Sequence, residues 1–315
     1  MPKYRDHLPQ MEGGFFLTDG GMETTLVFHD GIDLPHFAAF DLLRNTEGRQ
    51  RLRDYYDLYA GMAVKDGHGF ILETPTWRAS SDWGTLLGYS TEELANANRD
   101  GTALMEEVRR AFETPFTPMV ISGCIGPRGD GYDPGDVMTV VEARAYHAEQ
   151  IGTFAKTEAD MVTAITMTNV PEAIGLIQAA QAAQMPAAIS FTVETDGRLP
   201  TGESLKSAIE AVDDATGNGP AYYMINCAHP DHFSDALAKG EAWVMRLQGL
   251  RGNASRMSHE ELDNAEELDA GDPHEFGALK RGLVEKFAHI NVVGGCCGTD
   301  HRHVGAFCSG HRKAA

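Results

Sequence analysis

The sequence predicts an α/β protein folded as a single (β/α)8 TIM barrel, with its functional site at the C-terminal ends of the strands. Eight short β-like runs alternate with helical patterns along the chain, which is the order that a parallel barrel requires. Several runs are almost continuously apolar, as expected for strands that are covered on both faces. The length of 315 residues also suits one barrel. We therefore expect residues 1–315 to form one domain, and an open doubly wound sheet is the alternative.

The predicted strands are short apolar runs that end in polar or glycine-containing loops. The acidic stretch Ser258–Pro273 follows the seventh of these runs. Its charge predicts a solvated insertion, and a mobile lid is the alternative. In chain order the eight predicted strands are Phe15–Thr18, Phe70–Glu73, Met119–Ser122, Met161–Ile165, Ala187–Thr192, Tyr222–Asn226, Trp243–Leu247 and Ile290–Val293.

Helices are predicted between the strands because apolar residues recur there at helical spacing. The clearest start is at Ser90, which forms a capping box with Glu93 in the segment "STEEL". Other helices are indicated by Leu52, Tyr55, Tyr56, Tyr59 and Ala63, by Val140, His147, Ile151 and Phe154, and by Ile174, Ile177 and Ala180. Weaker patterns predict helices near Leu205–Val212, Phe233–Ala238, Phe276–Phe287 and His303–Phe307.

Composition excludes several classes of partner. The net charge of −20 argues against nucleic acid or an anionic membrane, since both reward positive charge. The N-terminus lacks the apolar core of a signal peptide, and no apolar run is long enough to cross a bilayer. Five cysteines in a chain of this size favour a cytoplasmic, reduced protein. No glycine-rich dinucleotide fingerprint is present, so no nicotinamide cofactor is expected, and a homo-oligomer is compatible with the sequence.

Polar and special residues follow several of the predicted strands directly. Because the carboxyl ends of all the strands meet at one rim of a barrel, we expect these residues to form a site there. They are Asp19 and Gly20 after the first strand, Glu73, Thr74 and Trp77 at the second, Asn226 and Cys227 at the sixth, and Cys296 and Cys297 after the eighth.

Cys227, Cys296 and Cys297 are candidates for one metal site. Three thiolates suit a tetrahedral Zn²⁺ whose fourth position stays open, as in catalytic zinc sites, and soft sulfur favours zinc over magnesium or calcium. A fourth protein ligand would instead give a structural or sensory zinc protein without turnover. The histidines that could supply it are His229, His301 and His303. A disulfide between the adjacent cysteines would be strained, and a dithiol oxidoreductase normally has two residues between its cysteines.

Four segments carry a family resemblance. "DGGMETTL", "GCIGPRGD", "INCAHP" and "VVGGCCGTD" together resemble the homocysteine S-methyltransferase family, which includes the betaine– and S-methylmethionine–homocysteine methyltransferases. The resemblance runs over essentially the whole chain and implies a (β/α)8 barrel. It also implies that Cys227, Cys296 and Cys297 bind zinc, and that Asp19 and Gly20 lie at the amino-acid substrate site.

The implied chemistry is a methyl transfer to a thiol. Zinc would bind the acceptor sulfur and deprotonate it at neutral pH. The thiolate would then attack a methyl group of an onium donor, which could be betaine-like, S-methylmethionine-like or a dimethylsulfonio compound. A cationic donor prefers aromatic faces, and Trp77 and Trp83 are candidates by position. We expect Asp19 to be catalytic and Asp19, Gly20, Glu73, Thr74, Trp77 and Asn226 to bind substrate.

The chain departs from the family pattern at one position. Relatives usually have a glutamate at the end of the fourth strand, which contacts the amino group of homocysteine, and here that position holds Ile165. Glu73 is placed to supply the missing negative charge from a neighbouring strand end. The acceptor is then homocysteine, giving methionine, or the change at Ile165 marks a different thiol acceptor.

Overall fold

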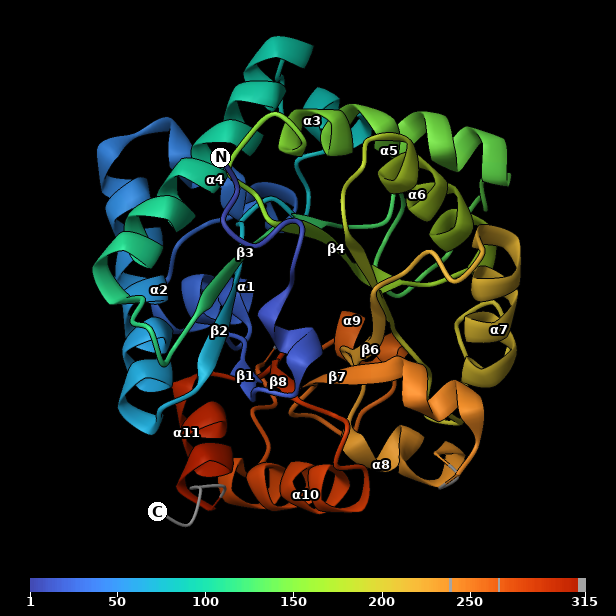
Figure 1. The fold of residues 1–315 in the computed structure, drawn as a ribbon. Coiled ribbons are helices and arrows are strands. Elements are labelled where there is room, and N and C mark those ends of the chain that lie inside the picture. Colours follow the sequence, from blue (N-terminus) through green and yellow to red (C-terminus); the bar gives the residue numbers. More distant parts are fainter. Residues whose placement is uncertain (238–239, 266, 311–315) are drawn as a thin grey trace.

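A closed barrel of eight parallel strands forms the centre of the molecule (Figure 1). The computed structural model describes residues 1–237, 240–265 and 267–310. Each strand pairs with its neighbours in sequence, and β1 closes the barrel by pairing with β8 through Phe16 and Val292. The strands are β1 Phe16–Leu17, β2 Gly69–Glu73, β3 Met119–Ile125, β4 Met161–Met167, β5 Ala187–Phe191, β6 Tyr222–Asn226, β7 Leu247–Gly252 and β8 Val292–Gly295.

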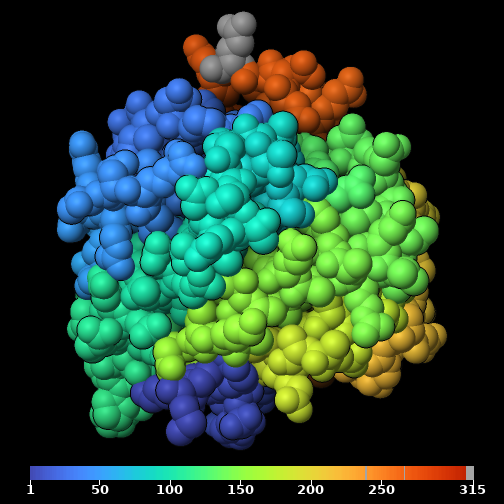
Figure 2. All heavy atoms as spheres, turned by 90° about the horizontal axis from the view of Figure 1, so that it is seen from above, coloured from blue at the N-terminus to red at the C-terminus, as the bar shows by residue number. Residues whose placement is uncertain are grey.

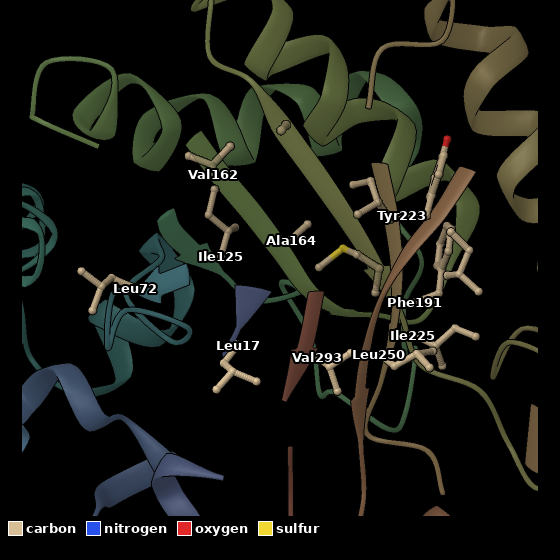
Figure 3. Close-up of a cluster of buried hydrophobic side chains, with 14 of the residues drawn as sticks. Leu17, Leu72, Ile125, Val162, Ala164, Phe191, Tyr223, Ile225, Leu250 and Val293 are labelled. Carbon is tan, nitrogen blue, oxygen red and sulfur yellow. The ribbon is translucent and has the colours of Figure 1, made fainter. Parts of the chain in front are cut away.

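Side chains of the strands alternate between two apolar layers, as the period of two requires. One set points outward to the helices (Figure 3) and includes Leu17, Leu72, Ile125, Val162, Ala164, Phe191, Tyr223, Ile225, Leu250 and Val293. The other set forms a separate cluster that includes Phe16, Ile71, Val120, Cys124, Met161, Ile165, Ala188, Tyr222, Met224 and Val292. Because both faces are buried, the strands read as continuous apolar runs.

Helices surround the barrel, and the space-filling view shows their side chains packed side by side (Figure 2). Side chains of Asn45, Ser90 and Thr139 accept hydrogen bonds from backbone N–H groups that open α2, α4 and α5. The expected capping box of Ser90 and Glu93 is present. The longer helices are α2 Thr46–Asp66, α4 Thr91–Phe112, α5 Val140–Phe154, α6 Val170–Ala182, α7 Leu205–Thr216, α10 Pro273–Lys286 and α11 His301–Gly310. The short ones are α1 Met22–Thr24, α3 Ser81–Leu86, α8 Pro230–Phe233 and α9 His259–Asp263.

Two sequence-based boundaries were wrong. The seventh strand was expected at Trp243–Leu247, but Ala242–Arg246 forms a 3-10 turn and β7 starts at Leu247. The expected helix near Phe233–Ala238 is divided into α8 and a 3-10 turn at Ser234–Ala236, and residue 238 lies outside the described residues. In a short apolar run, hydrophobic periodicity alone does not distinguish a strand from a packed 3-10 turn, and this explains the first error.

The N-terminal segment packs at the amino ends of the strands. Leu8 belongs to the same cluster as the barrel-facing side chains of the strands. The Nδ2 group of Asn291, immediately before β8, donates to the backbone oxygen of Gln10 over 2.7 Å. No helix in the described part of the chain combines the length and apolar character that crossing a membrane requires. The carboxyl ends of the strands are left for the site described next.

Candidate metal centre and substrate cavity

Three cysteine sulfurs converge beside the end of β7. Cys227 follows β6 and Cys296 follows β8, and β7 lies between those two strands. The Sγ atoms of Cys227, Cys296 and Cys297 all lie within 4.8 Å of one another. Cys227 Sγ is 3.2 Å from Cys297 Sγ. The convergence expected from strand order is therefore present.

Unusual backbone geometry produces this convergence. Cys227 has φ 53°, a left-handed conformation that is uncommon for residues other than glycine and is found at functional sites. Gly21 packs so closely on the loop after β8 that an added Cβ would lie 2.6 Å from the backbone oxygen of Cys296. The loop of β1 and the loop of β8 thus need glycine in order to touch.

Cys227 and Cys296 are joined as a disulfide in the structure, with 5.3 Å between their Cα atoms. This pairing differs from the disulfide of adjacent cysteines that the sequence offered as an alternative, and also from a fully reduced protein. The metal-competent cluster of the described residues contains these two cysteines and Cys297, and no histidine. His229 instead uses Nδ1 to accept the backbone N–H of Asp231.

The other two candidate histidines also lie away from the sulfur cluster. His303 is bonded to Asp300 and to the backbone oxygen of Ala270, and His301 opens α11 in an exposed position. None of the three histidines therefore closes the set of sulfur ligands.

A cavity of about 360 Å³ opens onto the three sulfurs at the carboxyl ends of the strands. At its floor, Arg251 Nη2 donates to Asp19 Oδ1 over 2.5 Å. Arg251 Nη1 lies 4.0 Å from Glu73 Oε1, and Tyr55 donates its hydroxyl to Asp19 Oδ2 over 3.1 Å. Asp19, Glu73 and Arg251 lie at the carboxyl ends of β1, β2 and β7, and all three line the cavity.

Burial controls the ionisation of these groups. Burial raises the pKa of Glu73 to about 7, and the positive charge of Arg251 opposes this shift. Burial also raises the pKa of Asp19, again opposed by Arg251. Burial disfavours the charged form of Arg251, but the negative charges of Asp19 and Glu73 outweigh this effect and raise its pKa. The floor of the cavity therefore holds one guanidinium between two carboxyl groups.

Gly20, Thr74, Trp77 and Ile165 line the cavity as well. Trp77 donates its indole N–H to the backbone oxygen of Ile165 over 3.0 Å, so the second and fourth strand ends share one wall. The structure places the apolar side chain of Ile165 in that wall, with 6% of its surface exposed. Thr74 Oγ1 accepts the backbone N–H of Cys124 and is thereby fixed in position.

Asn226 and Trp83, which were expected near the substrates, are engaged by other side chains of the protein. Asn226 is fully buried and does not line the cavity. Its side chain instead bonds to Thr166, Ser190 and Cys296, which braces the ends of three strands. The guanidinium of Arg78 lies 3.7 Å from the ring centre of Trp83, which therefore does not present that face to a donor. The side-chain amide of Asn226 suits this bridging position, because it both donates and accepts hydrogen bonds.

Three features were missed by the sequence-based reasoning. Arg251 was passed over because the seventh strand was placed too early, and the run Leu247–Gly252 was the signal that could have found it. Tyr132 hydrogen bonds to Cys297 and stacks on His259, with ring centres 4.0 Å apart. His259 Nε2 lies 3.1 Å from the backbone oxygen of Cys227.

The segment Ser258–Pro273 is more than a solvated insertion. It carries α9, and Leu262, Asp263, Glu267 and Asp269 line the cavity. His259 is buried, with 6% exposure, whereas its neighbours Glu260 and Glu261 are exposed. One side of the acidic segment therefore faces the site and the other faces solvent.

Comparisons with known proteins agree with this geometry. The family model described as Homocysteine S-methyltransferase matches residues 16–309. The chain is 24% identical over 307 residues to "Homocysteine S-methyltransferase 1" of Arabidopsis thaliana, covering 91% of this chain and 90% of that protein. It is also 24% identical to "Selenocysteine Se-methyltransferase" of Brassica oleracea var. italica, covering 91% and 86%.

Solved structures of the homocysteine methyltransferase MmuM from Escherichia coli share the fold. The oxidized form has a TM-score of 0.75 at 18% identity, covering 94% of this chain and 95% of that one. The metallated form has a TM-score of 0.73 at the same identity, covering 96% and 98%. The family match over nearly the whole barrel establishes that the chain belongs to the homocysteine S-methyltransferase family and is a methyltransferase.

Proposed function

We propose that the protein is a zinc-dependent S-methyltransferase that moves a methyl group from an onium donor to homocysteine, giving methionine. The observation that carries this proposal is the cluster of Cys227, Cys296 and Cys297, whose sulfurs face a cavity large enough for small substrates. A structural zinc site is normally closed by four protein ligands. The described cluster has three, and the open side faces the cavity.

The donor set fits zinc after reduction of the disulfide between Cys227 and Cys296. Three thiolates within 4.8 Å match soft, tetrahedral coordination. When bound there, zinc would lower the pKa of the acceptor thiol and so supply a nucleophilic sulfur at neutral pH. Support for a metal comes also from the MmuM structure described as metallated. The need for reduced thiols favours a cytoplasmic setting.

The side chains of the cavity would then bind and orient the two substrates. The ammonium of homocysteine would face Glu73 and Asp19 at the floor, where an unpaired buried charge would be costly. The sulfur would point to the cysteines, and the donor would enter from the mouth with its methyl carbon in line. A carbon–sulfur bond forms while the bond from carbon to the onium atom breaks, and the thiol proton passes to solvent. Walls that exclude water and fix both partners account for the catalysis.

A different thiol acceptor is the second candidate, because Ile165 replaces the carboxylate that relatives use. The similarity to a protein named selenocysteine Se-methyltransferase supports this alternative, since the two relatives are named for different acceptors. A zinc-thiolate protein without turnover is less well supported, because its site would have no use for the adjoining cavity.

The decisive experiment is a methyl-transfer screen on reduced, zinc-loaded protein. Onium donors are combined with homocysteine and with thiols that lack the amino group, and the zinc content of the same sample is measured. The proposal requires about one zinc per chain and methylated thiol product. Bound zinc without product from any pair would favour the non-catalytic alternative.

A further inference from the structure

The cavity carries far more negative than positive charge. Seven carboxylates and two guanidiniums line it in the described part of the chain. The carboxylates are Asp19, Glu23, Glu73, Asp130, Asp263, Glu267 and Asp269, and the guanidiniums are Arg78 and Arg251. Any ligand that enters the cavity therefore meets an excess of acidic groups.

Both guanidiniums are already engaged. Arg251 is paired with Asp19, and Arg78 lies 3.3 Å from Asp130. The guanidinium of Arg78 also stacks between two indoles, with 4.0 Å to the ring centre of Trp77 and 3.7 Å to that of Trp83. A carboxylate carried by the donor would find no described cation free to neutralise it at the mouth.

Several carboxylates, in contrast, have no cation. Among the described residues, no basic nitrogen lies within 4.0 Å of the side-chain oxygens of Glu23, Asp263 or Glu267. Glu73 is 4% exposed, and its Oε2 atom has no hydrogen-bond partner although it lies in the cavity wall. An unpartnered buried oxygen of this kind indicates a polar or cationic ligand.

Aromatic rings stand at the same opening. Phe28 and Phe37 line the cavity but are 48% and 53% exposed, which places them at its mouth. Phe37 has φ 56°, so its backbone is held in a conformation that is uncommon for a bulky residue. Exposed phenyl rings beside carboxylates provide the combination that attracts organic cations.

We propose that the mouth of this cavity selects onium donors of net positive charge and discriminates against zwitterionic donors such as betaine or dimethylsulfoniopropionate. The inference rests on the proposed methyl transfer and names the donor class for it. In-line transfer places the acceptor next to the cysteines and leaves the mouth to the donor. The exposed carboxylates of Asp263 and Glu267, together with Glu23 in the cavity wall, attract the onium charge. Phe28 and Phe37 face its methyl groups, and the same negative field repels a donor carboxylate.

Burial and the charge of Asp19 raise the pKa of Glu23 to about 6. Burial also raises the pKa of Asp263, and the charges of Asp130 and Asp133 raise it further. Burial is the larger cause of both shifts, and the neighbouring carboxylates add to it. Specificity against a zwitterionic donor then has two sources. The cavity carboxylates repel the carboxylate of the donor, and they attract the onium cation.

A matched pair of probes tests this inference. Dimethylsulfoniopropionate and its methyl ester share one sulfonium skeleton, and only the first carries a carboxylate. Calorimetry on the reduced, zinc-loaded protein should show that the ester binds about tenfold more tightly. The difference should shrink as ionic strength rises, because exposed charges are screened. Equal binding, or tighter binding of the zwitterion, would overturn the inference.

Two charge-removing variants locate the effect. Glu23→Gln and Glu267→Gln should each weaken binding of the ester several-fold and leave the zwitterion unchanged or bound more tightly. Glu210→Gln, which removes an exposed carboxylate on α7 outside the cavity, should change neither. Equal effects of Glu23→Gln and Glu210→Gln would contradict a local origin. Transfer to homocysteine is measured in the same samples, so a failure of methyl transfer is distinguished from a failure of donor selection.

Discussion

Arg251 Nη2 lies 2.5 Å from Asp19 Oδ1, and this buried ion pair joins the carboxyl end of β7 to that of β1 across β8. Asp19 is 3% exposed and Arg251 is 7% exposed, so water solvates neither charge well. Removing one partner of such a pair leaves the other buried without compensation. The pair therefore fixes both the shape and the charge of the cavity floor.

Asp19→Asn should lower the free energy of unfolding by about 3–5 kcal/mol, because the guanidinium of Arg251 loses its direct partner. Urea unfolding measures this loss. Asp57→Asn is the control, since it breaks a half-exposed pair with Arg53 and should cost less than about 1 kcal/mol. Zinc content should be unchanged and methyl transfer should fall. A variant that folds normally but loses zinc would show that Asp19 acts on the metal site instead.

Cys297→Ala should remove most of the bound zinc, because two remaining sulfurs do not hold the ion in a three-ligand site. Metal analysis of reduced, zinc-loaded protein measures the effect, with about one zinc per chain expected before substitution. Cys308→Ala is the matched control, since Cys308 is buried on α11 and lies outside the sulfur cluster. Full zinc occupancy in Cys297→Ala would refute the assignment of Cys297.

Glu73→Gln should weaken binding of homocysteine by about two orders of magnitude if Glu73 faces the ammonium of the acceptor. A thiol of similar size without an amino group, such as 3-mercaptopropionate, should bind equally well to both forms. Equal losses of affinity for the two thiols would show that Glu73 does not bind the ammonium group. If the unchanged protein never binds homocysteine, Ile165 marks a change of acceptor.

The raised pKa of Glu73 also predicts a pH dependence. Its pKa moves from the ordinary 4.5 to about 7 on folding, so the folded protein holds this proton more tightly than the unfolded chain. The contribution of Glu73 to stability is therefore complete below about pH 4.5 and is lost as the pH rises through about 7. Glu73→Gln should flatten the unfolding free energy over this range. Homocysteine binding should strengthen over the same range, because only the ionised carboxylate attracts the ammonium.

Tyr132→Phe should weaken zinc binding by about tenfold, because it removes the hydroxyl that hydrogen bonds to the Cys297 sulfur. Competition with a chelator measures the affinity. Tyr146→Phe removes a hydroxyl that bonds to Ser80, away from the cluster, and should leave zinc affinity unchanged. An identical affinity for all three proteins would mean that the hydrogen bond does not support the metal.

The sequence by itself determined the order of the elements and the edge at which the site lies. Eight apolar runs with helices between them lead to a closed parallel barrel, because each strand must be buried on both faces. Polar residues directly after those runs then share one rim, so Asp19, Glu73, Cys227 and Cys296 could be grouped without coordinates. These inferences depend only on local period and on strand direction.

Tertiary structure alone decided which of these residues touch and what charge surrounds them. Arg251 neutralises Asp19 because β7 starts at Leu247, a boundary that the apolar run before it obscured. Asn226 braces neighbouring strand ends instead of lining the cavity, since side-chain contacts depend on the closure of the barrel. The acidic segment with α9 folds back over the sulfurs through His259, a long-range contact that local composition does not encode.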